Sequence, residues 1–281
     1  MNRLLVGLIG AGIQRSLSPA LQEEEARRHG LRLHYQLIDL AAAGVGNEAL
    51  PGLIGAARVM RFDGLNVTYP SKQAVMPLVD GLSEEARAIG AVNTIVREGD
   101  RLVGHNTDAA GWAWGFRRAL PDADLSRVML LGAGGAGAAV GFAALGLGVS
   151  ELMVFDVDPS RSAALASNLA VSFPKGKVVA ITDLEASARR ATGVIHATPI
   201  GMTGSPGMPL DASLLRKDLW VSEVVYVPLE TELLKAAKRA GCRVMDGGHM
   251  NVGQAVRGFK LFTGREADPV RMEQHFRKLV G

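Results

Sequence analysis

Short apolar runs alternate with longer amphipathic stretches through most of the chain. Residues 4–9 form an apolar run followed by Gly10, which is typical of a buried strand that runs into a loop. The other elements predicted in this half are helices at 19–29 and 50–61 and strands at 34–39 and 62–67. We expect Ser18 to be the N-cap of the first helix and Pro19 its first helical residue. Such alternation favours a parallel sheet covered by helices, with ligand groups on loops at the carboxyl ends of the strands.

A second series of strands and helices begins at Arg127. Its strands are predicted at 128–131, 152–155, 178–181, 193–197 and 221–226. A helix at 109–119 and a polar turn at 121–126 precede the series, so this turn can link two domains. The last two predicted helices, 251–262 and 269–279, are amphipathic and can pack on either half.

Composition and charge narrow the class of protein. A length of 281 residues suggests about two domains. The formal charge of +3 and the isoelectric point near 9.2 are mildly basic. The lysines and arginines are scattered rather than gathered in a stripe, which argues against a nucleic-acid partner and leaves small anions as candidate ligands.

Cysteine usage and the apolar runs bear on the compartment. Cys242 is the single cysteine, so it cannot form an internal disulfide, and we expect a small buried residue. The amino-terminal apolar run is too short for a signal peptide, and no stretch approaches the length of a membrane span. We therefore expect a cytoplasmic protein with no membrane partner.

A glycine-rich turn follows the first strand of the second series. Gly132 permits a tight turn, Gly134 lets the backbone approach a pyrophosphate, and Gly137 allows the helix at 138–147 to pack closely on the strand. The residues whose amides would cradle the anion are Gly132, Gly134, Gly135, Ala136 and Gly137. A glycine-rich turn without a ligand is the alternative, but the position between a strand and a helix favours dinucleotide binding.

An acidic residue follows the next strand, at the distance expected for the group that pairs with the adenosine ribose. Asp156 can accept hydrogen bonds from the ribose hydroxyls and would repel a 2′-phosphate. Asp158 adds a second negative charge to the same loop, so we expect NAD to be preferred over NADP. Arg161 opposes this expectation if it binds a 2′-phosphate, but it can also stack on adenine or lie in solvent.

Polar residues lie at or after the predicted ends of several strands in the first half. The loops expected to meet there are 14–19, 66–72, 90–94 and 104–108. When a secondary alcohol is oxidised, hydride goes to a nicotinamide and another group takes the hydroxyl proton. A partly buried lysine beside a carboxylate can take it. Lys72 and Asp108 suit this role, although an ordinary surface ion pair is the commoner meaning of such a pair.

Several other polar residues also allow two interpretations, one structural and one functional. Ser16 and Ser18 can bind a ligand, but Ser18 is also a good N-cap. The histidines are dispersed, and we interpret His105 as a loop residue rather than a metal ligand, so no metal is expected. The sequence has no recognisable Ser-His-Asp elbow or thiol nucleophile, which argues against a hydrolase.

Together these motifs resemble the shikimate and quinate dehydrogenase family along nearly the whole chain. The matching stretches are 16–19, 64–72, 90–94, 104–108, 132–137, 197–202 and the tail around Gln254. The resemblance implies an α/β protein with an N-terminal substrate-binding and catalytic domain, residues 1–108 and 251–281. It also implies a Rossmann NAD-binding domain at 109–250, with the C-terminal helices returning to the first domain.

The resemblance also implies a role for individual residues. Lys72 and Asp108 would form the catalytic pair, and Ser16 and Ser18 would bind the substrate carboxylate. The residues that would hold ring hydroxyls are Thr68, Asn93, Tyr226 and Gln254. The positions that match the nicotinamide end of the cofactor site are Thr198, Met202, Val225, Gly247 and Met250.

Two stretches depart from the family pattern. Gln22 and Glu23 stand where many members carry His-Asn. Residues 156–161 replace the Asn-Arg-Thr type of sequence found in biosynthetic, NADP-using members, and they resemble the NAD-using quinate/shikimate branch. Residues 225–234 point the same way.

The leading hypothesis is an NAD-dependent enzyme, monomer or homodimer, that interconverts shikimate, quinate or both with their 3-dehydro products. One alternative is a dehydrogenase of a modified substrate such as an aminoshikimate. The other is a non-catalytic dinucleotide sensor that has kept the fold.

Overall fold

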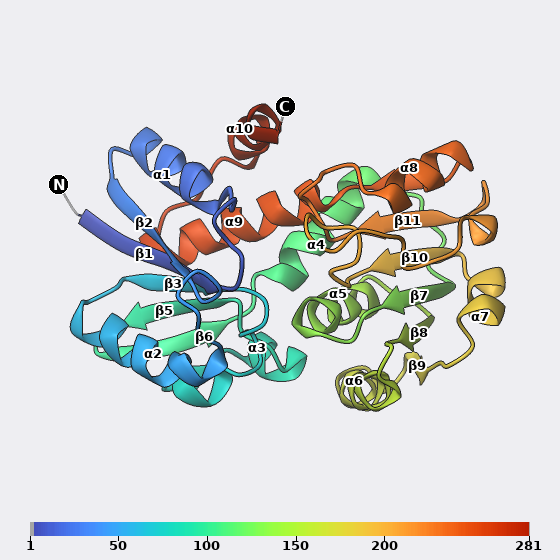
Figure 1. Ribbon diagram of the computed structural model, residues 1–281, viewed down its shortest axis with the longest axis horizontal. Helices are drawn as coiled ribbons and strands as arrows, with labels where there is room; N and C mark the ends of the chain where they lie inside the picture. The colour runs from blue at the N-terminus through green and yellow to red at the C-terminus, as the bar shows by residue number, and fades with distance from the viewer. Residues whose placement is uncertain (1–2, 281) are drawn as a thin grey trace. The chain divides into compact units, whose positions relative to one another are not determined.

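The chain forms two compact units, and a computed structural model describes residues 3–280 of it (Figure 1). The first unit comprises Met1–Thr107 and Gln254–Gly281, and the second comprises Asp108–Gly253. The chain therefore enters the second unit at the first residue of α4 (Asp108–Ala119) and leaves it within α9 (Gly247–Thr263). The polar turn at 121–126, which we expected to link two domains, lies inside the second unit.

Over the described residues, the first unit is built on a six-stranded sheet in the order β2-β1-β3-β5-β6-β4. Its strands are β1 (Arg3–Gly10), β2 (Arg32–Asp39), β3 (Gly64–Val67), β4 (Gly81–Leu82), β5 (Thr94–Glu98) and β6 (Arg101–His105). The strands predicted at 4–9, 34–39 and 62–67 are confirmed as β1, β2 and β3, with ends that move by one or two residues.

The expectation of a parallel sheet is wrong for the middle of this sheet. β5 runs antiparallel to both β3 and β6. The reason is a two-residue turn at Gly99 and Asp100, in which Gly99 has a φ of 65°, so that β5 and β6 form a hairpin. Because β5 is reversed, its amino end lies at the sheet edge where β1, β3 and β6 end.

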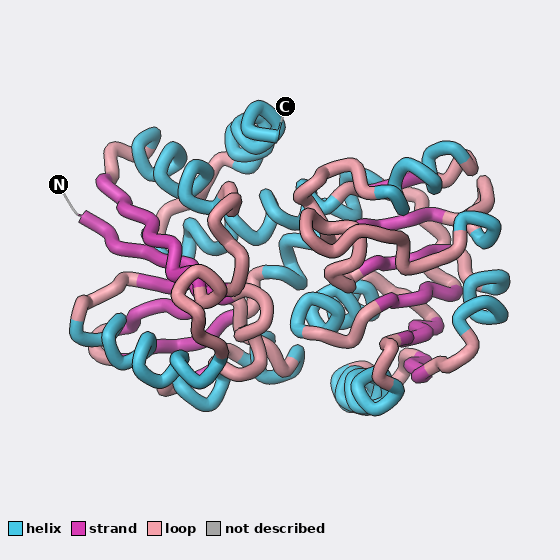
Figure 2. Tube along the Cα trace, in the orientation of Figure 1, coloured by secondary structure: helices cyan, strands magenta, loops and turns pink. Residues whose placement is uncertain are grey.

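Helices pack on this sheet and close its core. They are α1 (Ser18–Arg28), α2 (Leu50–Val59), α3 (Glu84–Ile89), the part of α9 from Gln254 onward, and α10 (Pro269–Val280), with short 3-10 turns at Asn47–Ala49 and Met76–Leu78. The helix predicted to reach residue 61 ends at Val59, because Arg61 adopts a left-handed conformation with a φ of 56°. Figure 2 shows how loops connect these helices to the strands.

The start of α1 corrects one prediction. Ser18 is the first residue of the helix, and Leu17 is the N-cap without a side-chain hydrogen bond. The hydroxyl of Ser16 instead accepts the Ser18 N–H at 3.3 Å. Ser16 therefore does part of the capping work that we expected of Ser18.

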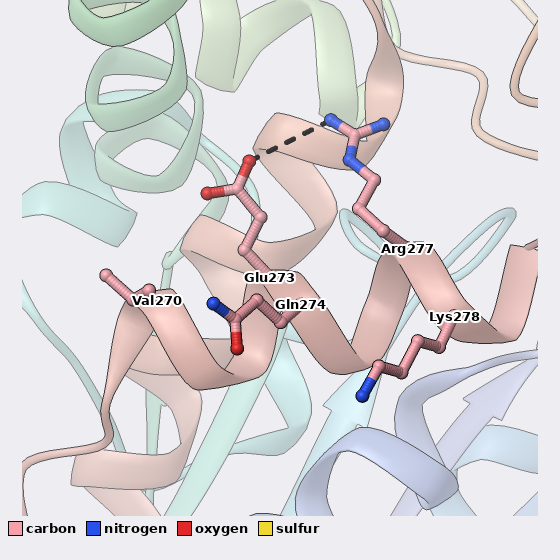
Figure 3. Close-up of a pocket in the computed structure, with 5 residues that line it drawn as sticks. All are labelled: Val270, Glu273, Gln274, Arg277 and Lys278. Atoms are coloured by element: carbon pink, nitrogen blue, oxygen red, sulfur yellow. Dashed lines mark ion pairs between the residues drawn. The ribbon is translucent and has the colours of Figure 1, made fainter.

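The outer face of α10 carries a hollow of about 440 Å³ (Figure 3). It is lined by Val270, Glu273, Gln274, Arg277 and Lys278, and Glu273 forms an ion pair with Arg277 at 3.9 Å. Because all these side chains come from one helix, they form a groove on the surface and do not enclose a ligand.

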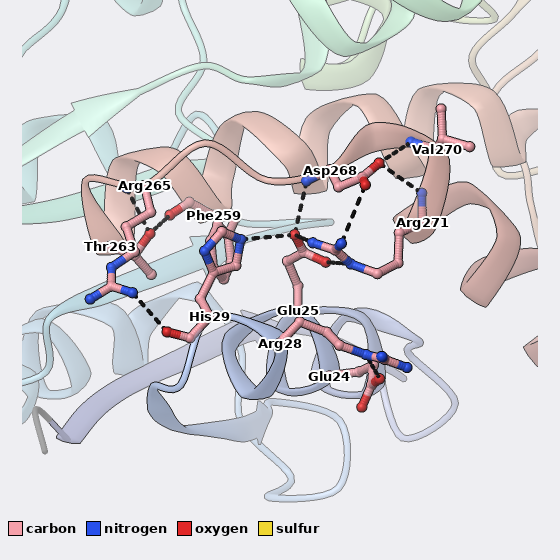
Figure 4. A network of polar contacts seen from close by, with 10 residues as sticks. All are labelled: Glu24, Glu25, Arg28, His29, Phe259, Thr263, Arg265, Asp268, Val270 and Arg271. Atoms are coloured by element: carbon pink, nitrogen blue, oxygen red, sulfur yellow. Dashed lines mark hydrogen bonds and ion pairs between the residues drawn. The ribbon is translucent and has the colours of Figure 1, made fainter.

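A buried carboxylate fastens the carboxyl-terminal segment to α1 (Figure 4). Glu25 is 2% exposed and accepts hydrogen bonds from Arg271 Nη2 at 2.6 Å, Arg271 Nε at 2.9 Å and the Asp268 N–H at 2.8 Å. Burial alone would raise the pKa of Glu25, but the hydrogen bonds from Arg271 and Asp268 outweigh it and hold the pKa below its ordinary value. The C-terminal helices, which the pattern alone allowed on either half, thus pack on the first unit.

Over its described residues, the second unit contains a wholly parallel six-stranded sheet in the order β12-β11-β10-β7-β8-β9. Its strands are β7 (Arg127–Leu131), β8 (Glu151–Phe155), β9 (Lys177–Ala180), β10 (Gly193–His196), β11 (Trp220–Glu223) and β12 (Arg243–Met245). Numbered from β7, the order is 3-2-1-4-5-6, the arrangement of a Rossmann domain. The expected Rossmann fold is therefore confirmed.

The helices of this unit are α4, α5 (Gly135–Gly146), α6 (Pro159–Ser172), α7 (Leu184–Arg190), α8 (Glu232–Arg239) and the first turns of α9, with a 3-10 turn at Ala212–Leu214. The strand predicted at 221–226 ends at Glu223, because the carboxylate of this residue binds the N–H groups of Val224 and Val225 and turns the chain out of the sheet. Cys242 is 8% exposed, as expected for a small buried residue. Within residues 3–280, no helix is both long and apolar enough to cross a bilayer.

Candidate active site

The loop after β3 and the segment before β5 meet beside the end of β1 in the first unit. The Thr68 N–H donates to the carbonyl of Ile9 at 2.9 Å, and the Val92 N–H donates to the carbonyl of Lys72 at 2.8 Å. A Cβ atom on Gly10 would lie 2.3 Å from Cγ2 of Thr68, so glycine is needed for this close approach. Thr68 and Lys72 are thereby held at the same edge of the sheet, as the sequence predicts.

Asn93 lies at this edge, but immediately before β5 rather than after a strand. Its Oδ1 accepts the Thr107 N–H at 2.8 Å and the Thr94 hydroxyl at 3.0 Å, and its Nδ2 donates to the Thr107 hydroxyl at 2.9 Å. The side-chain amide has two N–H groups, whereas its oxygen is already occupied. Asn93 is therefore set to donate a hydrogen bond to a hydroxyl rather than to accept one.

His105 ends β6, so our interpretation of it as a loop residue is wrong. Its backbone carbonyl accepts the N–H of Asn93 at 3.1 Å, which joins the 90–94 and 104–108 segments. Burial lowers the pKa of His105. The charge of Glu98 opposes this decrease, and the charge of Arg257 adds to it.

A buried aspartate, which sequence reasoning missed, shapes the loop that leads to Ser16. Asp39 is 8% exposed and accepts the N–H groups of Gly12 at 2.8 Å and Ile13 at 3.1 Å and the side-chain amide of Gln14 at 3.0 Å. Burial alone would raise the pKa of Asp39. Hydrogen bonds from the Gly12 N–H, the Gln14 side chain and the backbone of Ala41 and Ala42 outweigh burial and lower this pKa. A lone acidic residue at the end of a strand, opposite a glycine-rich loop, was the available signal.

Gln22 joins α1, the helix that begins at Ser18, to α9 beside Gln254. Its Nε2 donates to the carbonyl of Ala255 at 2.9 Å, so α1 is tied to α9 at the residue after Gln254. Gln22 is 1% exposed. Gln22 is one of the two residues that stand where many members of the resembling family carry His-Asn. Its buried amide therefore links α1, which carries Ser18, to α9, which carries Gln254.

The two residues expected to form the catalytic pair occupy different units. Lys72 is half-buried in the turn after β3 of the first unit. Asp108 is 4% exposed and begins α4 of the second unit, directly after Thr107 in the chain. Their pairing stays a prediction.

The glycine-rich turn between β7 and α5 has the geometry of a phosphate cradle. Gly132 has a φ of 101°, which favours glycine. A Cβ atom on Gly137 would lie 2.0 Å from the carbonyl oxygen of Gly132, so the helix start packs against the turn at a distance that only glycine allows. Gly134 is the N-cap of α5 with extended backbone, and Gly135 and Ala136 form the first turn of the helix. These residues fit the pyrophosphate of a dinucleotide, because the helix start offers its N–H groups to an anion.

Asp156 lies beside this cradle and is oriented by it. Its Oδ2 accepts the N–H of Ala133 at 2.7 Å, and its Oδ1 accepts the N–H of Asp158 at 3.0 Å. It is 9% exposed. A carboxylate fixed next to the glycine turn at the end of β8 is suited to accept hydrogen bonds from the hydroxyls of a ribose.

Asp158 and Arg161 flank the same loop. Asp158 is the N-cap of α6, and hydrogen bonds from the hydroxyl and N–H of Ser160 lower its pKa below the ordinary value. Arg161 is exposed, and its Nη2 would lie 3.4 Å from a Cβ atom on Gly134. Its guanidinium is therefore close to the pyrophosphate cradle.

The structure brings together several of the residues expected at the nicotinamide end. Cγ2 of Thr198 would lie 3.0 Å from a Cβ atom on Gly132, so the loop after β10 contacts the glycine turn. A Cβ atom on Gly247 would lie 2.3 Å from the carbonyl oxygen of Val225, so the start of α9 packs on the loop after β11. The remaining positions are Met202 at 39% exposure in the loop after β10 and Met250 at 5% exposure in α9. Tyr226, which we expect to hold a ring hydroxyl, follows Val225 in the loop after β11.

A second buried polar group that sequence reasoning missed lies beneath Thr198. His196 and Glu223, both fully buried, end the neighbouring strands β10 and β11, and Nδ1 of His196 lies 2.8 Å from Oε1 of Glu223. Nε2 of His196 lies 2.6 Å from the Thr198 hydroxyl. The signal available in the sequence was an ionisable residue, His196 or Glu223, at the end of each largely apolar strand. In the described part of the chain, no group of three or more His, Cys, Asp or Glu residues could hold a metal ion.

Comparison with known proteins agrees with this geometry. The family model for the shikimate dehydrogenase substrate binding domain matches residues 8–95. A shikimate dehydrogenase (NADP(+)) of Streptomyces avermitilis is 55% identical over 279 residues, which cover 99% of this chain and 96% of the relative. A quinate/shikimate dehydrogenase (NAD(+)) of Corynebacterium glutamicum is 44% identical over 281 residues, 99% of each chain.

A solved structure is also similar. The quinate dehydrogenase from Corynebacterium glutamicum in complex with NAD matches with a TM-score of 0.90 and 44% identity, and the match covers 99% of this chain and 100% of that one. These similarities make the chain an oxidoreductase that acts on a CH–OH group with a nicotinamide cofactor, and the alternative of a non-catalytic sensor is set aside. The chain belongs to the shikimate and quinate dehydrogenase family.

Proposed function

We propose that this enzyme interconverts shikimate, quinate or both with their 3-dehydro products and that it prefers NAD over NADP. The observation that carries the proposal is the Asp156 carboxylate, which the amides of Ala133 and Asp158 hold beside the glycine turn. The names of the relatives from Streptomyces avermitilis and Corynebacterium glutamicum support the substrate class. The first unit would bind the substrate and the second unit the cofactor.

The preference for NAD is argued from charge at the ribose. Two carboxylates, Asp156 and Asp158, lie in the loop that a 2′-phosphate would enter, and a phosphate there would meet like charge. The guanidinium of Arg161 lies toward Gly134, where it would contact the pyrophosphate. The higher identity to an NADP-named relative carries less weight, because a few residues around the ribose decide this preference.

The substrate would be held by hydrogen bonds from the edge of the first sheet. Ser16 and Ser18, at the start of α1, would donate their hydroxyls to the substrate carboxylate. Asn93 would donate to a ring hydroxyl through Nδ2, because its Oδ1 is occupied by Thr107 and Thr94. The other residues proposed for the ring hydroxyls are Thr68 at the same edge, Gln254 in α9, and Tyr226 in the loop after β11 of the second unit.

The chemical step moves a hydride and a proton. A nicotinamide cofactor held at the glycine turn would supply the hydride acceptor for the carbon that carries the hydroxyl. Lys72 would accept the hydroxyl proton while the carbonyl forms, and it would return the proton in the reverse direction. Asp108 would orient Lys72 and the hydroxyl through its carboxylate. The nicotinamide end would be lined by Thr198, Met202, Val225, Gly247 and Met250.

The test is a four-way assay of the purified enzyme with shikimate or quinate and NAD or NADP. We expect reduction of NAD with at least one acid and a lower kcat/KM for NADP. Absence of NAD reduction with both acids would overturn the proposed substrate class, and equal use of the two cofactors would overturn the preference. An aminoshikimate is tested in parallel as the alternative substrate. This alternative requires that the aminoshikimate has the highest kcat/KM of the three substrates.

A further inference from the structure

A buried chain of hydrogen bonds ends at the Thr198 hydroxyl. Glu223 accepts the backbone N–H groups of the next two residues, each at 2.9 Å, and the hydroxyl of Thr231 at 2.9 Å. Nδ1 of His196 lies 2.8 and 3.0 Å from its two oxygens. The Thr231 hydroxyl also accepts the N–H of Leu234 as the N-cap of α8, so it must donate its own proton to Glu223. The two backbone N–H groups and the Thr231 hydroxyl are thus donors to the carboxylate.

This arrangement fixes the direction of each hydrogen bond. An ionised carboxylate can only accept, so Nδ1 of His196 carries a proton, and in the neutral imidazole ring Nε2 is then an acceptor. The Thr198 hydroxyl, 2.6 Å away, then donates to Nε2. Its oxygen also accepts the N–H of Ile200 at 3.2 Å. One lone pair of the Thr198 oxygen remains, and this hydroxyl therefore acts toward a ligand as an acceptor.

The position of Thr198 indicates which part of the cofactor it meets. Its side chain lies against Gly132. The strand before it, β10, is the neighbour of β7 on the side away from β8 and Asp156. In a sheet of this order the dinucleotide crosses the carboxyl ends of the strands at this point. With the adenosine at Asp156, the nicotinamide half comes to Thr198.

We propose that Glu223 and His196 are positioning residues that make Thr198 a hydrogen-bond acceptor for the nicotinamide half of the cofactor. The group that Thr198 binds is a donor, either a hydroxyl of the nicotinamide ribose or the amino group of the carboxamide. The inference rests on the proposed function for the placement of the adenosine at Asp156. It does not depend on which acid is oxidised.

The test uses Thr198→Val and Glu223→Gln, alone and combined. The glutamine amide can accept the two backbone N–H groups with its oxygen and donate to Nδ1, which moves the histidine proton to Nε2 and turns Thr198 into a donor. Ser222→Ala is the matched control. Ser222 is fully buried on the same strand, and its hydroxyl accepts a hydrogen bond from Trp112 at 2.9 Å, away from this chain of bonds.

Binding of NAD, ADP-ribose and ADP to the full-length protein is measured by calorimetry without substrate. We expect each single variant to bind NAD about tenfold more weakly, the effect of one mismatched hydrogen bond, and to bind ADP as the parent does. The double variant should lose no more than either single variant, because both changes remove the same interaction. A parallel loss for ADP-ribose identifies the ribose hydroxyl, and an unchanged affinity for ADP-ribose identifies the carboxamide.

Three results would overturn the inference. They are unchanged NAD affinity in Thr198→Val, equal weakening of ADP and NAD in Glu223→Gln, and additive losses in the double variant. Nitrogen-15 spectra of the imidazole ring give an independent check, since the parent should show the Nδ1–H form of His196 and Glu223→Gln the Nε2–H form. Failure of the proposed function would appear differently, as a parent enzyme that binds NAD and oxidises neither acid.

Discussion

Replacement of Asp156 by Asn is expected to shift the cofactor preference from NAD toward NADP. The change removes one negative charge next to the position of the ribose 2′-oxygen. A 2′-phosphate of charge near −2, about 5 Å from the carboxylate, would be repelled by roughly 1.5–3 kcal/mol at effective dielectric constants between 80 and 40. The loss of this repulsion corresponds to about a 10- to 100-fold gain in kcat/KM for NADP relative to NAD, less at high salt.

The fold should tolerate this change at a modest cost. Asn can still accept the N–H of Ala133 through its oxygen, but its Nδ2 cannot accept the N–H of Asp158, which is now bonded at 3.0 Å. Loss of that hydrogen bond costs about 1 kcal/mol of stability. Thermal denaturation should therefore show a small decrease in Tm with one cooperative transition.

The assay is steady-state kinetics with both cofactors at two salt concentrations. Asp211→Asn is the matched control, because this aspartate also carries a single charge in the second unit and accepts the N–H of Ser213 before a 3-10 turn. We expect the control to leave the ratio of NAD to NADP efficiency unchanged. If the ratio in Asp156→Asn stays within twofold of the parent, the assignment of Asp156 to the ribose is refuted.

Three further predictions concern catalysis, stability and the cradle. Lys72→Ala should lower kcat by about 10²–10⁴-fold and leave NAD binding by calorimetry nearly intact; an equal loss of both would contradict its role as proton acceptor. Glu25→Gln should reduce the free energy of unfolding in urea by about 1–3 kcal/mol, whereas Glu24→Gln, one residue earlier with exposed partners, should change it little. Because the folded-state pKa of Glu25 is lowered, its stabilisation is complete at neutral pH and is lost as the pH falls through that lowered pKa; a parent–variant difference that stays constant down to the acid transition would refute this. Gly137→Ala should abolish NAD binding and lower Tm, because the new Cβ would meet a backbone carbonyl at 2.0 Å, while Gly146→Ala at the open end of the same helix should do neither.

The elements with a strong apolar period could be predicted from the sequence, and the β5–β6 hairpin could not. Residues 94–98 and 101–105 adjoin or overlap the polar motifs at 90–94 and 104–108. We interpreted these motifs as loops and predicted no strand between them. The alternation within each strand is short, and its polar positions belong to the motifs. The turn at Gly99 and Asp100 was the local feature that indicates a hairpin. Because the hairpin reverses β5, the polar loops still meet at one edge, although for a different reason than a parallel sheet provides.

The parts of the site that lie within one loop were also predictable, because their chemistry follows from local spacing. The glycine turn and Asp156 are separated by one helix and one strand, and the Rossmann pattern fixes where each falls. Asp39 could not be assigned in this way. It acts on Gly12 and Ile13 across the parallel pairing of β1 with β2, in which Gly10 stands opposite Asp39.

The same physical reason explains why His196 and Glu223 escaped sequence reasoning. Each residue ends an apolar strand, and taken singly a charged residue at a strand end is usually a solvated loop residue. In the sheet, β10 pairs with β11 in parallel, and the register places His196 directly opposite Glu223. A charge that would be exposed at the end of one strand is therefore buried and paired across two. The register, which no motif encodes, is what converts two unremarkable strand ends into a buried support for Thr198, and polar residues that end adjacent parallel strands should be examined as pairs.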